Sequence, residues 1–260
     1  MGVKTGLRRM AERVTGPLIL VRKAPMGGGR LAVSPSVGGL KYLLKPATAW
    51  DPELVRMAGL LVTRGACVWD IGANSGLFSA AAAHHAGPEG HVLAIEADTD
   101  AVRLLYRTVQ LQPTGQCRIE VVPVAIARNP GFVHFAIAKR ARAANAIDGY
   151  GSTQTGGVKE LRTLPAVALD DLLEHFPPPT VLKIDVEGAE LEVLSGAWRV
   201  LTQYRPAIYC EVSAQRRDEV SALFQRYGYS LFDGASYRGK GSEIINLCSL
   251  NTIALHETEA

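Results

Sequence analysis

The residues with the clearest chemistry lie in the segment 68–76, which reads VWDIGANSG. Its apolar first half contains a carboxylate, Asp70, and two glycines follow at Gly72 and Gly76. This pattern predicts a buried strand, a glycine turn and a helix that begins near Leu77. Such an arrangement is typical of a nucleotide-cofactor site at the carboxyl end of a parallel strand. Glycine suits the turn because a Cβ would block a close approach of the backbone to a ligand.

The spacing of the turn indicates which cofactor it suits. The dinucleotide fingerprint requires glycines in the order G-x-G-x-x-G, with a pyrophosphate at the helix N-terminus. Here Asn74 stands at the middle glycine position and Leu77 at the third. Asp70 also places a negative charge where a phosphate would be unfavourable. The turn therefore favours a cofactor with a cationic end, S-adenosylmethionine, and replacing Asp70 by alanine is expected to abolish its binding and leave the fold intact.

A second acidic residue follows the next predicted strand. The run His91–Glu96 is apolar and ends in a carboxylate, which can accept hydrogen bonds from both hydroxyls of a ribose. Together the two segments predict a nucleoside-type cofactor site. The predicted cofactor-binding residues are Asp70, Gly72, Ala73, Asn74, Gly76, Glu96, Ala97 and Ala125.

With three further segments, these residues resemble the FkbM family of S-adenosylmethionine-dependent methyltransferases. The matching segments are DIGANSG at 70–76, IEAD at 95–98, LDDL at 169–172, LKIDVEGAE at 182–190, and 206–211. The stretch KIDVEGAE is the most specific, because many methyltransferases share the glycine turn. The family usually shows asparagines near Thr108 and Gln112, and this chain has none there. The resemblance implies a class I methyltransferase sheet of seven strands with the last one antiparallel.

Hydrophobic patterning predicts alternating helices and strands over most of the chain, which is typical of a parallel sheet with helices on both faces. Helices are expected at 52–62, 76–85, 100–110, 189–201 and 217–227, and strands at 66–71, 91–96, 118–124, 181–185, 207–212, 229–232 and 251–255. An antiparallel excursion at 131–137 and a glycine-rich loop at 141–157 interrupt this order. We therefore predict a Rossmann-like α/β fold, with an N-terminal extension at 1–50 and an S-adenosylmethionine-binding domain at 51–260.

The composition indicates the class of protein and the cellular compartment to expect. The chain has 260 residues, of which 47% are hydrophobic, and no apolar run approaches the roughly 18 residues of a membrane span. Its four cysteines are scattered without metal-type spacing, and with no apparent signal peptide they predict a reduced, cytoplasmic protein. Residues 1–45 contain nine basic side chains and one acidic one. This basic arm is expected to be a solvated extension or to contact an anionic membrane surface or an acidic substrate.

Three carboxylates are the candidates for catalysis. Asp185 and Glu211 end predicted strands, and Glu187 follows two residues after Asp185. Ligands of an open α/β sheet lie outside the carboxyl ends of its strands. Methyl transfer to a hydroxyl requires positioning and a base or a metal for the proton. We expect Asp185 to contact the acceptor, with Glu187 and Glu211 assisting, and Glu190 to serve the helix N-terminus. No paired-histidine spacing predicts a tightly bound metal, although weak Mg²⁺ assistance through Asp185 and Glu211 stays open.

The expected acceptor is a small molecule, a sugar or a lipid-linked hydroxyl compound, as the resemblance implies for O-methyltransferases of sugars, glycolipids, polysaccharides and natural products. Tyr150 and Ser152 in the 141–157 loop are the predicted substrate-binding residues. One alternative is a nucleic-acid methyltransferase that holds phosphates with the basic arm. The segment 185–188 (DVEG) lacks the Asn/Asp-Pro-Pro-aromatic motif of the amine-methylating forms, so no nucleic acid is expected. A non-catalytic cofactor-binding scaffold is the other alternative.

Overall fold

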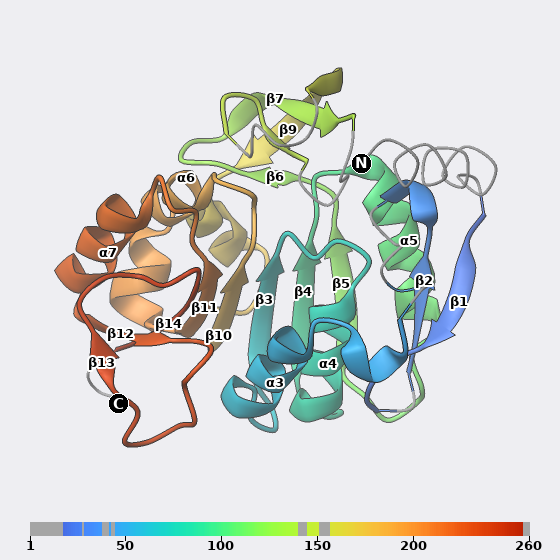
Figure 1. Cartoon of the computed structure of the whole chain (residues 1–260), viewed down its shortest axis with the longest axis horizontal. Helices are drawn as coiled ribbons and strands as arrows, with labels where there is room; N and C mark the ends of the chain where they lie inside the picture. The colour runs from blue at the N-terminus through green and yellow to red at the C-terminus, as the bar shows by residue number, and fades with distance from the viewer. Residues whose placement is uncertain are drawn as a thin grey trace, which may run out of the picture.

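The computed structural model describes residues 18–27, 29–37, 42, 45–139, 145–150 and 157–256. Its centre is an eight-stranded sheet with the order β13–β12–β14–β11–β10–β3–β4–β5 (Figure 1). The strands are β3 (Cys67–Ile71), β4 (His91–Ile95), β5 (Arg118–Val122), β10 (Val181–Ile184), β11 (Ala207–Glu211), β12 (Tyr229–Asp233), β13 (Ile244–Ile245) and β14 (Asn251–His256). The last strand, β14, pairs antiparallel with both β11 and β12, as expected. The expected count of seven strands misses only the two-residue edge strand β13.

Helices cover both faces of this sheet, because successive strand residues point to opposite sides. Val68 of β3 packs in one cluster with Phe78, whereas its neighbour Trp69 packs in another with Val193. The helices on the Val68 face are α3 (Pro52–Leu61), α4 (Leu77–Ala86) and α5 (Thr99–Gln110), and those on the other face are α6 (Glu190–Ser195) and α7 (Arg217–Arg226). Burial on both faces explains why the strands read as continuous apolar runs.

The single helix predicted at 189–201 is wrong, because the chain turns after α6. A Cβ at Gly196 would lie 2.6 Å from the carbonyl oxygen of Ala127, so only glycine allows this approach. A five-residue π-helical turn, Val200–Tyr204, then follows. Asp170 caps it, since its carboxylate accepts hydrogen bonds from the backbone N–H groups of Arg199 (2.7 Å) and Val200 (3.0 Å).

A second sheet lies above the carboxyl ends of β3, β4 and β5 (Figure 1). It contains β6 (Ala125–Ile126), β7 (Gly131–Ala138), β8 (Ala146–Ile147) and β9 (Val158–Val167), in the order β6–β9–β7–β8. The strand predicted at 131–137 is β7. Its long partner β9 was not predicted, because charged residues and Pro165 interrupt the apolar pattern and most of its residues are at least partly exposed. The small sheet caps the edge where the cofactor site was expected.

The N-terminal part of the described chain forms a hairpin of β1 (Leu20–Lys23) and β2 (Arg30–Val33). The hairpin packs on α5, where the Ala32 N–H donates to Thr108 Oγ1 (3.0 Å). Gln112 Nε2 donates to the Arg30 carbonyl (2.9 Å). Thr108 and Gln112, near which the resemblance to the FkbM family led us to expect asparagines, thus both anchor the hairpin. Among the described residues, no helix is long and apolar enough to cross a membrane.

Candidate active site

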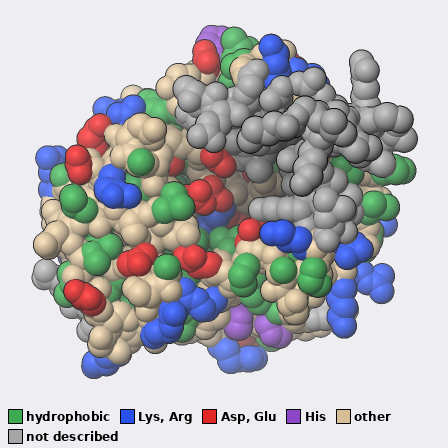
Figure 2. All heavy atoms as spheres, viewed as in Figure 1, with side chains coloured by type: hydrophobic (Ala, Val, Ile, Leu, Met, Phe, Trp, Pro, Cys, Tyr) green, Lys and Arg blue, Asp and Glu red, His purple; other side chains and the backbone are tan. Residues whose placement is uncertain are grey.

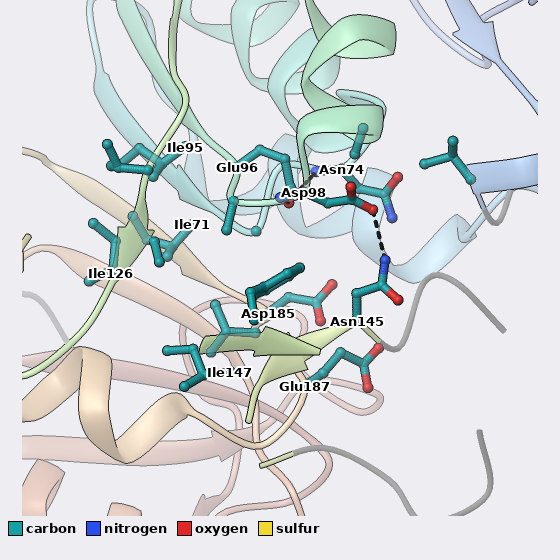
Figure 3. Close-up of a pocket in the computed structure, with 18 residues that line it drawn as sticks. Ile71, Asn74, Ile95, Glu96, Asp98, Ile126, Asn145, Ile147, Asp185 and Glu187 are labelled. Atoms are coloured by element: carbon teal, nitrogen blue, oxygen red, sulfur yellow. Dashed lines mark hydrogen bonds between the residues drawn. The ribbon is translucent and has the colours of Figure 1, made fainter. Parts of the chain in front are cut away.

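Two open cavities meet at the carboxyl edge of the main sheet. The first, here called the cofactor cavity, holds about 700 Å³ of empty space, counted with its open mouth. Figure 3 shows isoleucine side chains at one end of it and polar side chains at the other. The labelled apolar residues are Ile71, Ile95, Ile126 and Ile147, and the polar ones are Asn74, Glu96, Asp98, Asn145, Asp185 and Glu187. Ala97 and Ala125, two of the residues predicted to bind the cofactor, also line this cavity.

The glycine turn joins the two strands that carry the site. Gly72 has a φ of 76°, and a Cβ there would lie 1.9 Å from the carbonyl oxygen of Asp185. At Gly76, with a φ of 90°, a Cβ would lie 2.8 Å from Leu105 Cδ1. The close approach that these glycines allow is therefore to other parts of the chain. The expected approach to a ligand is not needed to explain either of them, although Gly72 also lines the cavity.

Glu96 lines the cofactor cavity beside this turn. Its two carboxylate oxygens accept hydrogen bonds from the backbone N–H groups of Asn74 and Asp98, each at 2.7 Å. Burial raises the pKa of Glu96 to about 7, although these two hydrogen bonds act to lower it. Each oxygen retains acceptor capacity, so the geometry fits hydrogen bonds from ribose hydroxyls.

Asp70 lies beneath the turn and is fully buried. Ser79 Oγ donates to its Oδ2 (2.5 Å), and Lys183 Nζ lies 3.1 Å from its Oδ1. Lys183 also donates to the carbonyl of Gly72 at 2.7 Å. Burial acts to lower the pKa of Lys183, but the carboxylates of Asp70 and Asp185 outweigh it and raise the pKa. The direct contact expected between Asp70 and a cationic ligand is therefore replaced by a buried ion pair that supports the turn.

Asp185 and Glu187 line both cavities at their junction. Asp185 Oδ2 lies 3.6 Å from Lys183 Nζ, which orients it. Glu187 has a φ of 53°, a conformation that is unusual for a residue other than glycine. Burial, followed by the charges of Asp185 and Glu211, raises the pKa of Glu187 to about 8. Glu190, buried in the same turn, accepts from the Gly188 N–H (2.7 Å), which matches its expected structural role.

The second cavity, here called the acceptor cavity, opens on the other side of the junction and measures about 1160 Å³ including its mouth. Glu211 and Ala73 line it, together with four residues that the sequence did not indicate: Tyr42, Asp51, Glu53 and Tyr209. Tyr42 donates its hydroxyl hydrogen to Asp51 Oδ2 at 3.2 Å. The only signal for them in the sequence was weak: two acidic residues, Asp51 and Glu53, flank Pro52 at the start of α3.

Comparison with known proteins decides the family. The model of the methyltransferase FkbM domain matches residues 70–231, more than half of the chain. The chain belongs to the FkbM methyltransferase family. No curated protein sequence matches it significantly.

Several solved methyltransferase structures are similar to this chain. The FkbM methyltransferase from Methylobacillus flagellatus KT is 18% identical with a TM-score of 0.50, and the match covers 76% of this chain. It covers 45% of that protein, so this chain spans less than half of its relative's length. A precorrin-6y C5,15-methyltransferase from Geobacter metallireducens is 14% identical, with a TM-score of 0.44 and coverage of 79% and 87% of the two chains. A SAM-dependent methyltransferase from Aquifex aeolicus is 15% identical, with a TM-score of 0.41 and coverage of 83% and 95%.

In this FkbM domain the small sheet reaches the cofactor cavity through a residue that was not predicted. Asn145 lies between β7 and β8 and donates from Nδ2 to Asp98 Oδ2 at 2.7 Å (Figure 3). Tyr150, the predicted substrate-binding residue, lies instead under the Arg216 guanidinium, 5.6 Å from its ring centroid. Ser152 lies outside the described residues. Asn145 carried no signal in the sequence because its neighbours show no periodicity.

The expected cofactor of an FkbM domain is S-adenosylmethionine. A metal ion is a separate question, which concerns the carboxylates of Asp185 and Glu211. Within the described part of the chain, no three His, Cys, Asp or Glu side chains are grouped so that they could hold a metal ion. Weak Mg²⁺ assistance through Asp185 and Glu211 therefore gains no support from the structure.

Proposed function

We propose that this chain is an O-methyltransferase that transfers the methyl group of S-adenosylmethionine to a hydroxyl of a sugar, glycolipid, polysaccharide or natural-product acceptor. The observation that carries the proposal is the junction of the two cavities. Gly72, Asn74, Asp185 and Glu187 line both of them. A donor in one cavity and an acceptor in the other would thus meet beside two carboxylates, and positioning of this kind is the main requirement of methyl transfer.

The cofactor cavity fits the proposed cofactor in its chemistry. Its isoleucine-lined end suits an adenine ring, and Glu96 offers two carboxylate oxygens for ribose hydroxyls. The polar end at Asn74 and Asp185 suits the charged methionine portion. When bound, S-adenosylmethionine would supply an electrophilic methyl carbon attached to a sulfonium.

The carboxylates at the junction would accept the proton that the acceptor hydroxyl loses. Glu187 would accept the hydroxyl proton as the acceptor oxygen bonds to the methyl carbon, and the electrons of the broken carbon–sulfur bond would stay with the sulfur. A base works best when its pKa is near the working pH, and the pKa of Glu187 is raised to about 8. Asp185, held by Lys183, would orient the hydroxyl, and Glu211 would contact the acceptor from the adjacent strand.

The two alternative functions have less support. A nucleic-acid substrate would bring phosphates to an acceptor cavity lined by carboxylates, which repel them. A non-catalytic scaffold would have no use for an acidic junction between two cavities. A lipid-linked acceptor would give the basic arm at 1–45 a role at an anionic membrane surface.

Calorimetric titration with S-adenosylhomocysteine, beside NAD as a control, tests the cofactor. Micromolar binding of the former alone is expected, and binding of neither would overturn the proposal. The transfer itself is tested by incubating the protein with isotopically labelled S-adenosylmethionine and acceptors offered as free alcohols and as their O-methyl ethers. Label should enter the free alcohol, and Glu187→Gln should reduce its rate of incorporation.

A further inference from the structure

The small sheet forms part of the wall of the cofactor cavity. Phe135 of β7, Asn145 and Ile147 of β8 line this cavity. Glu96 and Asp98, at the carboxyl edge of the main sheet, line it as well. Figure 2 shows a hollow on the face below the small sheet, with Asp and Glu side chains along its edge. The contacts that fix the small sheet to the main sheet therefore also fix the shape of the cavity.

Arg162 of β9 attaches the small sheet to the N-terminus of α5. It is paired with Phe135 in the register of β9 and β7, so both side chains point to the same face of the small sheet. Its guanidinium donates to Asp98 Oδ1 (3.2 Å), Asp100 Oδ2 (3.2 Å) and Thr99 Oγ1 (2.9 Å). The side chain of Arg162 is 19% exposed and that of Asp98 is 5% exposed. Water and salt therefore screen this ion pair only weakly.

Two side chains from the small sheet and its connections hold Asp98 at once. Its Oδ1 accepts from Arg162, and its Oδ2 accepts from Asn145 at 2.7 Å (Figure 3). Asn145 is itself fixed, because its Oδ1 accepts from the Ala138 N–H of β7 at 2.8 Å. Among the described residues, only Arg162 forms an ion pair with Asp98. Without the guanidinium, this buried carboxylate would keep its hydrogen bond from Asn145 but lose its counter-charge.

The backbone of Asp98 connects this anchor to the carboxylate that is expected to bind the ribose. The Asp98 N–H donates to Glu96 Oε1, and the Asn74 N–H donates to Glu96 Oε2, both at 2.7 Å. These two backbone groups orient the Glu96 carboxylate in the cavity. Fixing Asp98 therefore fixes one of the two donors on which the position of Glu96 depends.

We propose that Arg162 is a positioning residue for the cofactor: it holds Asp98, and through the Asp98 backbone Glu96, in the geometry that binds the ribose. This inference rests on the proposed function, because it takes the cofactor cavity as the site of S-adenosylmethionine. Arg162 is not one of the described residues that line the cavity, so it acts on the ligand only through these neighbours. Support of this kind raises affinity because less of the site has to be ordered on binding.

Calorimetry of the full chain tests this role with two ligands, S-adenosylhomocysteine and 5′-methylthioadenosine, a nucleoside probe that lacks the amino-acid part. Arg162→Ala should weaken both by the same factor, about tenfold, the value of one charge-assisted hydrogen bond. The number of binding sites per chain should not change, whereas partial unfolding would lower it. The matched control is Arg118→Ala, which should bind normally. Arg118 pairs with Glu120 along β5 at 3.2 Å, as Arg162 pairs with Glu160 along β9 at 3.0 Å.

A double-variant cycle with Glu96→Gln separates positioning from a general loss of stability. If Arg162 acts through Glu96, Arg162→Ala should weaken binding by no more than about threefold in the Glu96→Gln background, because both changes affect the same contact. Arg162→Gln, which removes the charge but keeps a long polar side chain, takes the place of Arg162→Ala if the latter does not fold.

Native affinity in the Arg162 variants would overturn the proposal, and so would losses of affinity that add fully in the double variant. Failure of the unaltered protein to bind S-adenosylhomocysteine would instead refute the proposed function, so the two failures are distinguishable.

Discussion

Replacing Asp70 by alanine should destabilise the fold as well as the cofactor site. Asp70 is 0% exposed and Lys183 2%, so the substitution leaves a buried ammonium with Asp185 at 3.6 Å and the Gly72 carbonyl at 2.7 Å as its main remaining partners. Breaking one partner of a buried pair costs about 3–5 kcal/mol. Because these two contacts remain, we expect the free energy of unfolding to fall by about 3 kcal/mol, the lower end of that range. That is a large part of the roughly 5–15 kcal/mol of a typical domain.

Urea unfolding followed by circular dichroism measures this loss, with Glu89→Ala as an exposed acidic control. The double variant Asp70→Ala/Lys183→Met removes both charges. It should be more stable than the sum of the two single losses predicts, by at least about 2 kcal/mol, because no unpaired charge remains. An Asp70→Ala variant that loses less than about 1 kcal/mol, or single losses that add in the double variant, would refute the ion-pair argument.

Three further substitutions examine the walls of the site. Because Glu187 must be ionised to accept a proton and its pKa is about 8, kcat/KM should rise as the pH increases toward that value. Glu187→Gln should lower the rate by about 10²-fold or more and remove this rise in a pH profile. Gly72→Ala should abolish S-adenosylhomocysteine binding in calorimetry, because its Cβ would meet a carbonyl at 1.9 Å. Gly115→Ala, with a φ of 88° and open space around it, should bind normally. Asn145→Ala should weaken that binding by roughly 1 kcal/mol through loss of the bond to Asp98.

Each of these three predictions could be contradicted by a specific result. A Glu187→Gln variant that keeps the same pH profile would move the proton acceptor elsewhere. Normal ligand binding by Gly72→Ala would show that the turn tolerates a shift away from Asp185. Unchanged affinity of Asn145→Ala for S-adenosylhomocysteine would show that the small sheet does not contribute to binding in the cofactor cavity.

Local patterns were sufficient to predict the central α/β architecture and several of the residues that line the cofactor cavity. The strand, turn and helix around Gly72 and the carboxylate of Glu96 are encoded within short windows, where apolar periodicity and glycine spacing act directly on the backbone. Most predicted helices and strands agree with the structure to within two residues. One exception is the helix predicted after Ala189. It is interrupted at Gly196, which packs closely against the carbonyl oxygen of Ala127, a residue far away in the sequence.

The sequence by itself determined which residue types stand at the ends of the strands. Only the tertiary structure decided what those residues face. Asp70 meets Lys183 because β3 and β10 are adjacent in parallel register. Tyr209 joins the carboxylate of Glu53 because β11 lies beneath the start of α3, more than a hundred residues away in the chain. Lateral strand order arises from packing across the whole sheet, so no local period of the sequence encodes which side chains share a cavity.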